Sequence, residues 1–276
     1  MPEETLKRFL ERYPRLFVLT GAGCSTESGI PDYRDEEGAW KNAQPIQFRD
    51  FMTDPLRRAR YWARSLIGWR HFGAARPNAA HASLAELERQ GRIELLVTQN
   101  VDGLHQVAGS HRVVDLHGRL DAVRCMQCGD VRRRSALQPM LEALNPEWRH
   151  REAVTAPDGD ALLVDVDFAG FKVPSCECCG GILKPDVVFF GENVPQDRVQ
   201  AAYAGLGRAD AMLVVGSSLM VYSGYRYARA AAERGLPIAA VNRGRTRADA
   251  LLSFKVSRPC GETLSELASA LACHLP

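Results

Sequence analysis

The chain has 276 residues, 46% of them hydrophobic and 25% charged, which is the balance of an ordinary globular protein with one large or two unequal domains. Its formal net charge of +2 argues against a polycation that binds nucleic acid, and no apolar run reaches the ~18 residues of a transmembrane span. Residues 1–14 carry early acidic side chains and resemble neither a signal peptide nor a transit peptide. We therefore expect a cytoplasmic protein that binds neither nucleic acid nor membrane, with a monomer as the working expectation.

Apolar periodicity predicts helices and buried strands that alternate along the chain. In chain order we expect a helix at 3–12, a strand at 16–19, one or two helices within 48–72 over the loop that follows this strand, a helix at 78–90, strands at 93–98 and 113–118, an insert with cysteines from 120 to about 186, a strand at 211–216, a helix at 224–234, strands at 237–242 and 254–256, and a helix at 262–272. This order is typical of an α/β fold, a doubly wound, Rossmann-like parallel sheet interrupted by a small module.

The domain boundaries follow from the same pattern. We assign residues 1–36, 75–120 and 187–276 to the Rossmann-like domain, residues 37–74 to a helical insertion beside the cofactor, and residues 121–186 to the module with cysteines.

The stretch GAGCSTESGIPDYR at 21–34 follows the first predicted strand. Its two glycines and the small polar residues after them predict a tight turn that leads into a helix N-terminus, where free N–H groups suit a pyrophosphate. The usual dinucleotide fingerprint is incomplete, because Thr26 replaces the third glycine and no acidic residue follows about 20 residues on. Gly-Ile-Pro at 29–31 then ends the helix early. A strand–turn–helix without a ligand remains the alternative.

The insert contains two CxxC pairs, each followed by glycine, at Cys125 and Cys128 and at Cys176 and Cys179. Four thiolates satisfy a tetrahedral zinc ion and leave no open position, so the predicted site is structural. The separation of the pairs exceeds the usual spacing of about 15–20 residues, which we attribute to an insertion. Cys178 competes with Cys179 as the fourth ligand, although the glycine pair that follows favours Cys179. Disulfides and free redox thiols are the alternatives.

Polar residues follow the predicted strand at 93–98. Gln99, Asn100 and Asp102 lie just beyond its carboxyl end, where open parallel sheets bind ligands. His117 follows the next strand, and an imidazole with a pKa near 6.5 can accept a hydroxyl proton at neutral pH. A structural role is the alternative for His117, and His81, His105 and His111 qualify equally by residue type. The Gly-Ser-Ser run at 216–218 predicts either a phosphate or ribose site or a plain turn.

These motifs together resemble the sirtuins, which are NAD-dependent protein deacylases. The resemblance rests on GAGCSTESGIPDYR at 21–34, TQNVDGLH at 98–105, DLHG at 115–118, the CxxC pairs, LKPDVVFFGE at 183–192, VVGSSL at 214–219 and VNRG at 241–244. The segments LNPEW at 144–148 and APDGD at 156–160 further resemble the class II, mitochondrial-type and bacterial sirtuins, which are associated with lipoamidase and ADP-ribosyltransferase activity.

The resemblance implies which residues bind NAD, the co-substrate that the reaction consumes. It implies pyrophosphate contacts for Gly21, Ala22, Gly23 and Ser25, and a nicotinamide pocket with Ile30 and Asp102. It implies a mobile loop that closes over NAD, formed by Pro31, Asp32, Tyr33 and Arg34. Gln99 and Asn100 would bracket the nicotinamide ribose and its attacking water. The phosphate and adenosine side would comprise Gly216, Ser217, Ser218, Asn242, Arg243, Gly244 and Cys260.

The resemblance also implies the reaction, which removes acyl groups from protein lysine side chains and releases nicotinamide and 2′-O-acyl-ADP-ribose. His117 would be the general base, with Asn100 and Asp102 as the other catalytic residues. One zinc ion would bind the four cysteines. The acyl-lysine peptide would pair by strand addition with Val188, Phe189, Phe190, Gly191 and Glu192. The alternatives are a protein ADP-ribosyltransferase and a sensor that binds NAD without turnover.

Tyr61 and Arg64 are three residues apart on one face of a predicted helix. Their spacing resembles the pair with which some sirtuins bind an acidic acyl group. Packing and solvation of the helix is the equally weighted alternative.

Overall fold

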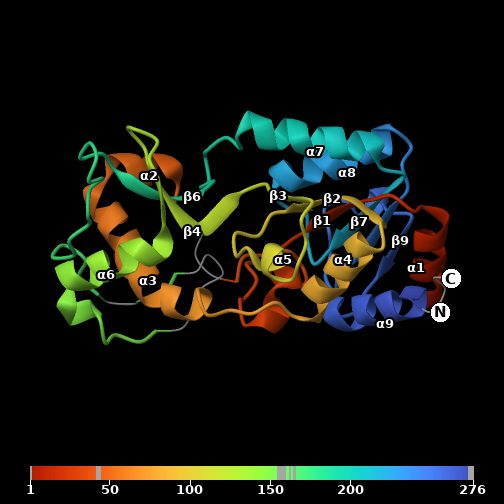
Figure 1. Ribbon diagram of the computed structural model, residues 1–276, viewed down its shortest axis with the longest axis horizontal. Coiled ribbons are helices and arrows are strands. Elements are labelled where there is room, and N and C mark those ends of the chain that lie inside the picture. The colour runs from red at the N-terminus through yellow and green to blue at the C-terminus, as the bar shows by residue number, and fades with distance from the viewer. Residues whose placement is uncertain (1, 42–44, 154–159, 162, 164–165, 273–276) are drawn as a thin grey trace.

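The computed structural model describes residues 2–41, 45–153, 160–161, 163 and 166–272. A large body contains a parallel sheet with strands in the order β3-β2-β1-β7-β8-β9, and a small body lies beside it (Figure 1). The parallel strands are β1 (Leu16–Thr20), β2 (Ile93–Thr98), β3 (Val113–Asp115), β7 (Ala211–Val215), β8 (Ile238–Val241) and β9 (Phe254–Val256).

The sheet reverses its strand order at β1. β1 pairs in parallel with β2 on one side and with β7 on the other. Every residue of β1, β7 and β8 is buried, as expected for central strands covered on both faces. The crevice at the carboxyl ends of β1 and β7 is therefore the place where a doubly wound sheet binds its ligand.

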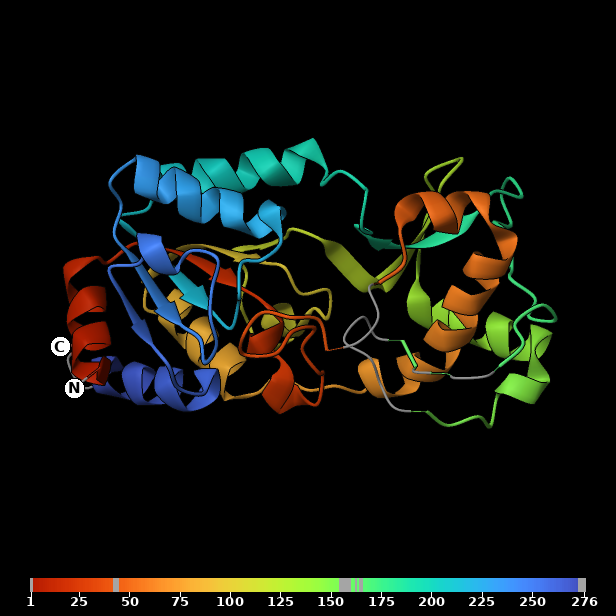
Figure 2. The same ribbon diagram turned by 180° about the vertical axis from the view of Figure 1, so that it is seen from behind.

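Helices cover both faces of this sheet (Figures 1 and 2). One face carries α1 (Pro2–Arg12), α4 (Ala79–Arg89) and α9 (Cys260–Ala272), and the other carries α7 (Gln196–Arg208) and α8 (Tyr222–Glu233). Val18 packs in the core of the first face, whereas its neighbours Phe17 and Leu19 pack in the core of the second. This alternation is the two-residue period of a strand. The short helix α5 (Leu104–Val107) follows β2.

In the part of the chain that the structure describes, the small body combines an antiparallel sheet with three α-helices. Its strands run in the order β5-β4-β6, with β5 at Val131–Arg133, β4 at Gly118–Cys125 and β6 at Leu183–Val187. Its helices are α2 (Phe48–Thr53), α3 (Pro55–Phe72) and α6 (Arg134–Leu144). Asp54 caps α3, because its Oδ1 accepts hydrogen bonds from the N–H groups of Leu56 and Arg57.

One hydrophobic core joins the parts of the small body. Phe51 and Trp62 from the helices pack with Val123 and Leu183 from the sheet. The helical insertion predicted at 37–74 and the module predicted at 121–186 therefore share a core.

The doubly wound α/β fold and the predicted strands are confirmed. The helices within 48–72 belong to the small body, and the core they form includes Ile30 from the loop at 21–34. Helix α7 was not predicted; its sequence QDRVQAAYAGLGR contains two glycines, which are poor helix formers. The predicted loop at 156–160 lies outside the described residues except for Asp160. None of the described helices is long and apolar enough to cross a membrane.

Candidate active site

A cleft of about 710 Å³ lies between the two bodies at the carboxyl ends of β1 and β7. Its lining includes most of the residues predicted to bind NAD or the peptide. These are Gly21, Ala22, Gly23, Asp32, Tyr33, Arg34, Tyr61, Gln99, Asn100, His117, Val188, Phe189, Phe190, Gly191, Glu192, Gly216, Ser217, Ser218, Asn242, Arg243, Gly244 and Cys260. The predicted residues outside the lining are Ser25, Ile30, Pro31, Arg64 and Asp102.

Two loops pack backbone against backbone at the floor of this cleft. The N–H of Gly23 donates to the carbonyl of Gly216 over 2.9 Å. Gly216 has a φ of +59°, and a Cβ on it would stand 2.3 Å from the backbone nitrogen of Cys24. A Cβ on Gly21 would stand 2.7 Å from that of Ser217. The glycines are therefore required for the two loops to approach each other.

The turn after β1 differs from the predicted helix N-terminus. Residues 22–24 and 26–28 form two short 3₁₀ turns, and Gly29 ends the second with a φ of +81°. Such short turns have little of a helix macrodipole. Any phosphate bound here would be held by individual backbone N–H groups.

Ser25 connects the predicted nicotinamide residues from behind the cleft wall. Its Oγ donates to Asp102 over 2.7 Å and accepts a hydrogen bond from Nδ2 of Asn100 over 3.0 Å. The same Nδ2 lies 3.0 Å from the carbonyl oxygen of Gly21. The N–H of the buried Ile30 donates to the carbonyl of Ser25 over 3.3 Å. These contacts fix Asn100 in the cleft wall, and they gather Ile30 and Asp102 directly behind it.

His117 is the one histidine of the four candidates that lines the cleft. His81 and His105 are fully buried behind Ser25, with ring centroids 4.7 Å apart, and burial lowers the pKa of His105 to about 3. His111 is exposed on the surface. Of these four histidines, only His117 is therefore placed where it could contact a ligand in the cleft.

The hydrogen bonds of His117 define its tautomer. Its Nδ1 lies 3.0 Å from the carbonyl oxygen of Gln99, which can only accept, so Nδ1 carries the proton. Its Nε2 therefore has a free electron pair, to which the hydroxyl of Ser223 donates over 2.7 Å. Burial, with a smaller contribution from the cationic Arg198 and Arg226, lowers the pKa of His117 to about 4 against the opposing effect of the Gln99 carbonyl. The ring is neutral at pH 7 and can act as a base.

The segment after β8 forms the end of the cleft that is predicted to hold the adenosine. Nδ2 of Asn242 donates to the carbonyl of Gly244 over 2.9 Å, and the N–H of Arg245 donates to the carbonyl of Glu36 over 2.7 Å. Burial raises the pKa of the Cys260 thiol to about 12. Cys260 therefore contributes a neutral, apolar surface at this end of the cleft.

Several lining residues were not predicted from the sequence, namely Glu36, Ser223, Arg226, Arg245 and Arg258. Ser223 and Arg226 lie in the first turns of α8, shortly after the VVGSSL segment. A helix that starts beside a ligand-binding strand end is a signal that could have pointed to Ser223.

The predicted acyl-binding pair is divided between two environments. Tyr61 is buried and lines the cleft, with its ring centroid 5.3 Å from that of Phe189. Arg64 instead donates to the carbonyl of Ala161 over 2.7 Å and lies 3.9 Å from the buried carboxylate of Asp160. Both roles proposed for Arg64 stay predictions, and these contacts favour packing.

The four-cysteine cluster has the dimensions of a zinc site. Sγ of Cys125 lies 3.5 Å from that of Cys179, and Sγ of Cys128 lies 3.8 Å from that of Cys176. Sulfurs placed ~2.3 Å from a tetrahedral zinc ion are about 3.8 Å apart, whereas a disulfide is ~2.0 Å long. All described cysteines are free, so disulfide pairing is excluded for them.

Cys179 is the fourth member of this cluster, as the glycine pair after it indicates. Sγ of Cys178 faces elsewhere, 3.4 Å from Nη2 of Arg132 and 3.9 Å from a carboxylate oxygen of Asp130. The residues present therefore fit one structural zinc ion held by four thiolates.

Comparisons with known proteins agree with this geometry. The sequence profile of the Sir2 family matches residues 21–223. An NAD-dependent protein deacetylase of Bordetella bronchiseptica is 64% identical over 266 residues, which cover 96% of this chain and 97% of that protein. The mitochondrial NAD-dependent protein lipoamidase sirtuin-4 of Bos taurus is 49% identical over 262 residues, which cover 94% of this chain and 83% of that protein.

Solved structures give the same result. A structure described as Sir2 with a p53 peptide and NAD+ superposes with a TM-score of 0.77 at 30% identity, covering 99% of this chain and 100% of that one. A complex of a Sir2 homologue with NAD superposes with a TM-score of 0.75 at 32% identity, covering 99% of this chain and 95% of that one.

Proposed function

This chain belongs to the Sir2 family and is an NAD-dependent protein deacetylase, and on that premise we propose how its cleft performs the reaction. The observation that carries the proposal is the neutral His117, whose Nε2 electron pair faces a cleft shared by the glycine loops and the segment at 188–192. The proposed substrates are NAD and an acetyl-lysine peptide.

NAD spans the cleft from the segment at 242–244 to Asn100. Its pyrophosphate lies against the loops at 21–23 and 216–217, which only glycine allows to pack so closely. The nicotinamide enters the space beside Asn100, in front of Ile30 and Asp102. Residues 31–34 close over it, and they already contribute Asp32, Tyr33 and Arg34 to the lining.

The peptide lies along residues 188–192. Backbone hydrogen bonds supply its affinity, so the protein has little preference for the sequence around the modified lysine. The acyl-lysine side chain then enters the cleft beside Tyr61 and Phe189, whose rings contact each other with centroids 5.3 Å apart.

The reaction begins when the acyl carbonyl oxygen attacks C1′ of the nicotinamide ribose. The C1′–N bond breaks, its electron pair leaves with nicotinamide, and an imidate links the lysine to ADP-ribose. His117 accepts the proton of a ribose hydroxyl, whose oxygen attacks the imidate carbon. Water then adds to that carbon, which releases the free lysine and 2′-O-acyl-ADP-ribose.

The position of His117 suits this step for two reasons. Its proton on Nδ1 is held by the Gln99 carbonyl, so the base acts through Nε2 alone. Its low pKa keeps it neutral before the reaction, so the base is in its active form at pH 7. The hydroxyl of Ser223 must leave Nε2 when the ribose hydroxyl approaches, because one electron pair accepts one proton.

Mass spectrometry of the products tests this proposal. Incubation with NAD and an acetyl-lysine peptide should yield equal amounts of nicotinamide, deacetylated peptide and 2′-O-acetyl-ADP-ribose. A protein that instead gained the mass of ADP-ribose, with no loss of the acetyl group, would support ADP-ribosyl transfer as the main reaction and contradict the proposal.

The same assay defines the acyl group. Acetyl, lipoyl and succinyl peptides are compared, since the bovine relative is named a lipoamidase. We expect neutral acyl groups to react faster than succinyl, because Arg64 is engaged by Asp160 and Ala161. A preference for succinyl would show that Tyr61 and Arg64 bind a carboxylate.

A further inference from the structure

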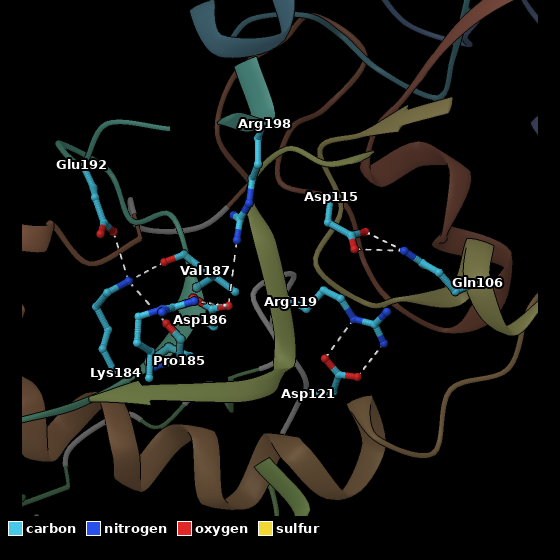
Figure 3. A network of polar contacts seen from close by, with 11 residues as sticks. Gln106, Asp115, Arg119, Asp121, Lys184, Pro185, Asp186, Val187, Glu192 and Arg198 are labelled. Atoms are coloured by element: carbon cyan, nitrogen blue, oxygen red, sulfur yellow. Dashed lines mark hydrogen bonds and ion pairs between the residues drawn. The ribbon is translucent and has the colours of Figure 1, made fainter. Parts of the chain in front are cut away.

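A buried lysine lies beneath the proposed peptide-binding segment. Lys184 belongs to β6 and is only 3% exposed. Its Nζ donates to the carbonyl of Val187 over 2.5 Å and to that of Pro185 over 3.3 Å, and it lies 3.0 Å from Oε2 of Glu192 (Figure 3). Lys184 does not line the cleft, so it cannot touch a bound peptide directly.

Glu192 carries this contact into the backbone of the segment. Its Oε2, which faces Lys184, also accepts a hydrogen bond from the N–H of Phe189 over 2.9 Å. The N–H of Glu192 returns a hydrogen bond to the carbonyl of Phe189 over 3.0 Å. Gly191 completes this tight turn with a φ of +80°. The ion pair thus binds the backbone of residues 187–189 at two points, a carbonyl and an N–H.

The same segment is tied to the catalytic base and to the helices of the small body. The N–H of Val188 donates to the carbonyl of His117 over 2.8 Å, and the N–H of Phe48 donates to the carbonyl of Phe190 over 2.8 Å. A shift of residues 187–192 therefore changes the distance between a bound peptide and His117. Transfer reactions are sensitive to displacements of about 1 Å.

Burying the cation of Lys184 costs free energy of folding, so stability by itself does not explain its presence. Burial lowers the pKa of Lys184, which shows that its surroundings oppose the charge even though Glu192 favours it. Buried ion pairs can often be replaced by apolar side chains without loss of stability. The rings of Phe189 and Phe48, which lie 4.6 and 5.8 Å from Nζ, offset part of the cost of burying this charge. The directional hydrogen bonds to the backbone are what an apolar side chain could not supply.

We infer that Lys184 is a positioning residue, which acts through Glu192 and the carbonyl of Val187 to hold residues 187–192 in register for the acyl-lysine peptide. The inference rests on the proposed function in one respect, the placement of the peptide along residues 188–192.

The test measures peptide affinity without turnover. A fluorescein-labelled p53-derived peptide that carries one acetyl-lysine is titrated with the full chain in its zinc-loaded form, and its Kd is read from anisotropy. Lys184→Met should raise this Kd about tenfold. Lys184→Arg keeps the donor and should recover most of the affinity. The Kd for ADP-ribose, a ligand of the other wall of the cleft, should stay within about twofold.

Arg134 offers a matched control. It is another cation of the small body, 1% exposed, and it is held by the carbonyl of Ser65 and the rings of Trp62 and Trp69. Arg134→Met should lower the Tm but leave the peptide Kd unchanged. If Lys184→Met fails to fold, Glu192→Gln replaces it, because the amide keeps the shape and loses the charge.

An unchanged peptide Kd in Lys184→Met, or in Glu192→Gln where that variant replaces it, overturns the inference. So does an equal rise in Arg134→Met, because that would mean a general loss of packing. A failure of the proposed function appears instead in the reaction products, which this binding assay does not use.

Discussion

The two bodies of this protein bury different kinds of side chain. Among the described residues, the buried Asp, Glu, Lys and Arg side chains are Arg134, Asp160 and Lys184, and all of them belong to the small body. The large body buries His81 and His105, which their surroundings keep neutral. The large body is therefore held by apolar burial, whereas the geometry of the small body depends on charges and on four thiolates.

This difference matches what each wall of the cleft has to do. The large body offers backbone from glycine loops, whose shape follows from the sheet beneath them. The small body offers residues 188–192, whose shape depends on an ion pair and on the sheet whose strand β4 ends at the zinc cysteine Cys125. We therefore expect the structure of residues 188–192, the proposed peptide wall of the cleft, to be disrupted more easily than that of the glycine loops, the proposed NAD wall.

Loss of the zinc site should have the largest effect. Cys179→Ser removes one thiolate, and structural zinc contributes about 10–16 kcal/mol in small zinc-dependent domains. The small body should then lose its packing, which can be followed by fluorescence because Trp62, Trp69 and Trp148 all belong to its core. Binding of ADP-ribose, measured by calorimetry, should persist.

Cys178→Ser is the matched control, since Cys178 lies outside the four-cysteine cluster. It should keep one zinc per chain and a native fluorescence spectrum. Loss of zinc from Cys178→Ser but not from Cys179→Ser would contradict the ligand assignment. Loss of ADP-ribose binding together with the small body would contradict the independence of the two walls.

A smaller effect is expected from acid, which acts on the large body through its buried histidines. His105 has a pKa of about 3 when folded and ~6.5 when unfolded, so the unfolded state binds more protons between these values. The stability that His105 contributes is present above pH 6.5 and is lost as the pH falls. At pH 5 the loss is about 2 kcal/mol. Urea denaturation followed by circular dichroism at pH 7.5 and 5.0 measures it.

His105→Gln provides the control, because glutamine does not titrate. Its free energy of unfolding should depend less on pH than that of the original protein, by about 2 kcal/mol over the same interval. An identical pH dependence in both proteins would show that the protonation of His105 is not coupled to unfolding.

The sequence predicts the large body better than the small one, for physical reasons. β1, β7 and β8 are continuous apolar runs because they are buried on both faces, and such runs are visible in a single sequence. The small body depends on contacts between distant segments, such as Trp62 Nε1 with the carbonyl of Leu183, which no local pattern encodes.

The site follows the same rule. The glycines, the CxxC pairs and His117 lie in short motifs, so their roles can be predicted. Ser223 meets His117 only in the folded chain, and Lys184 occupies a strand position where nothing in the sequence distinguishes a buried cation from an exposed one. The contacts of Arg64 with Asp160 and Ala161 likewise join segments far apart in the sequence.

The most direct test of the central claim is the yield of 2′-O-acetyl-ADP-ribose from His117→Ala. Removal of a general base should lower the rate of product formation by about 10²–10⁴. Zinc content, Tm and ADP-ribose affinity should remain those of the original protein, because His117 lies at the cleft surface between β3 and β4. Near-normal formation of 2′-O-acetyl-ADP-ribose by a folded, zinc-loaded His117→Ala protein would contradict the account.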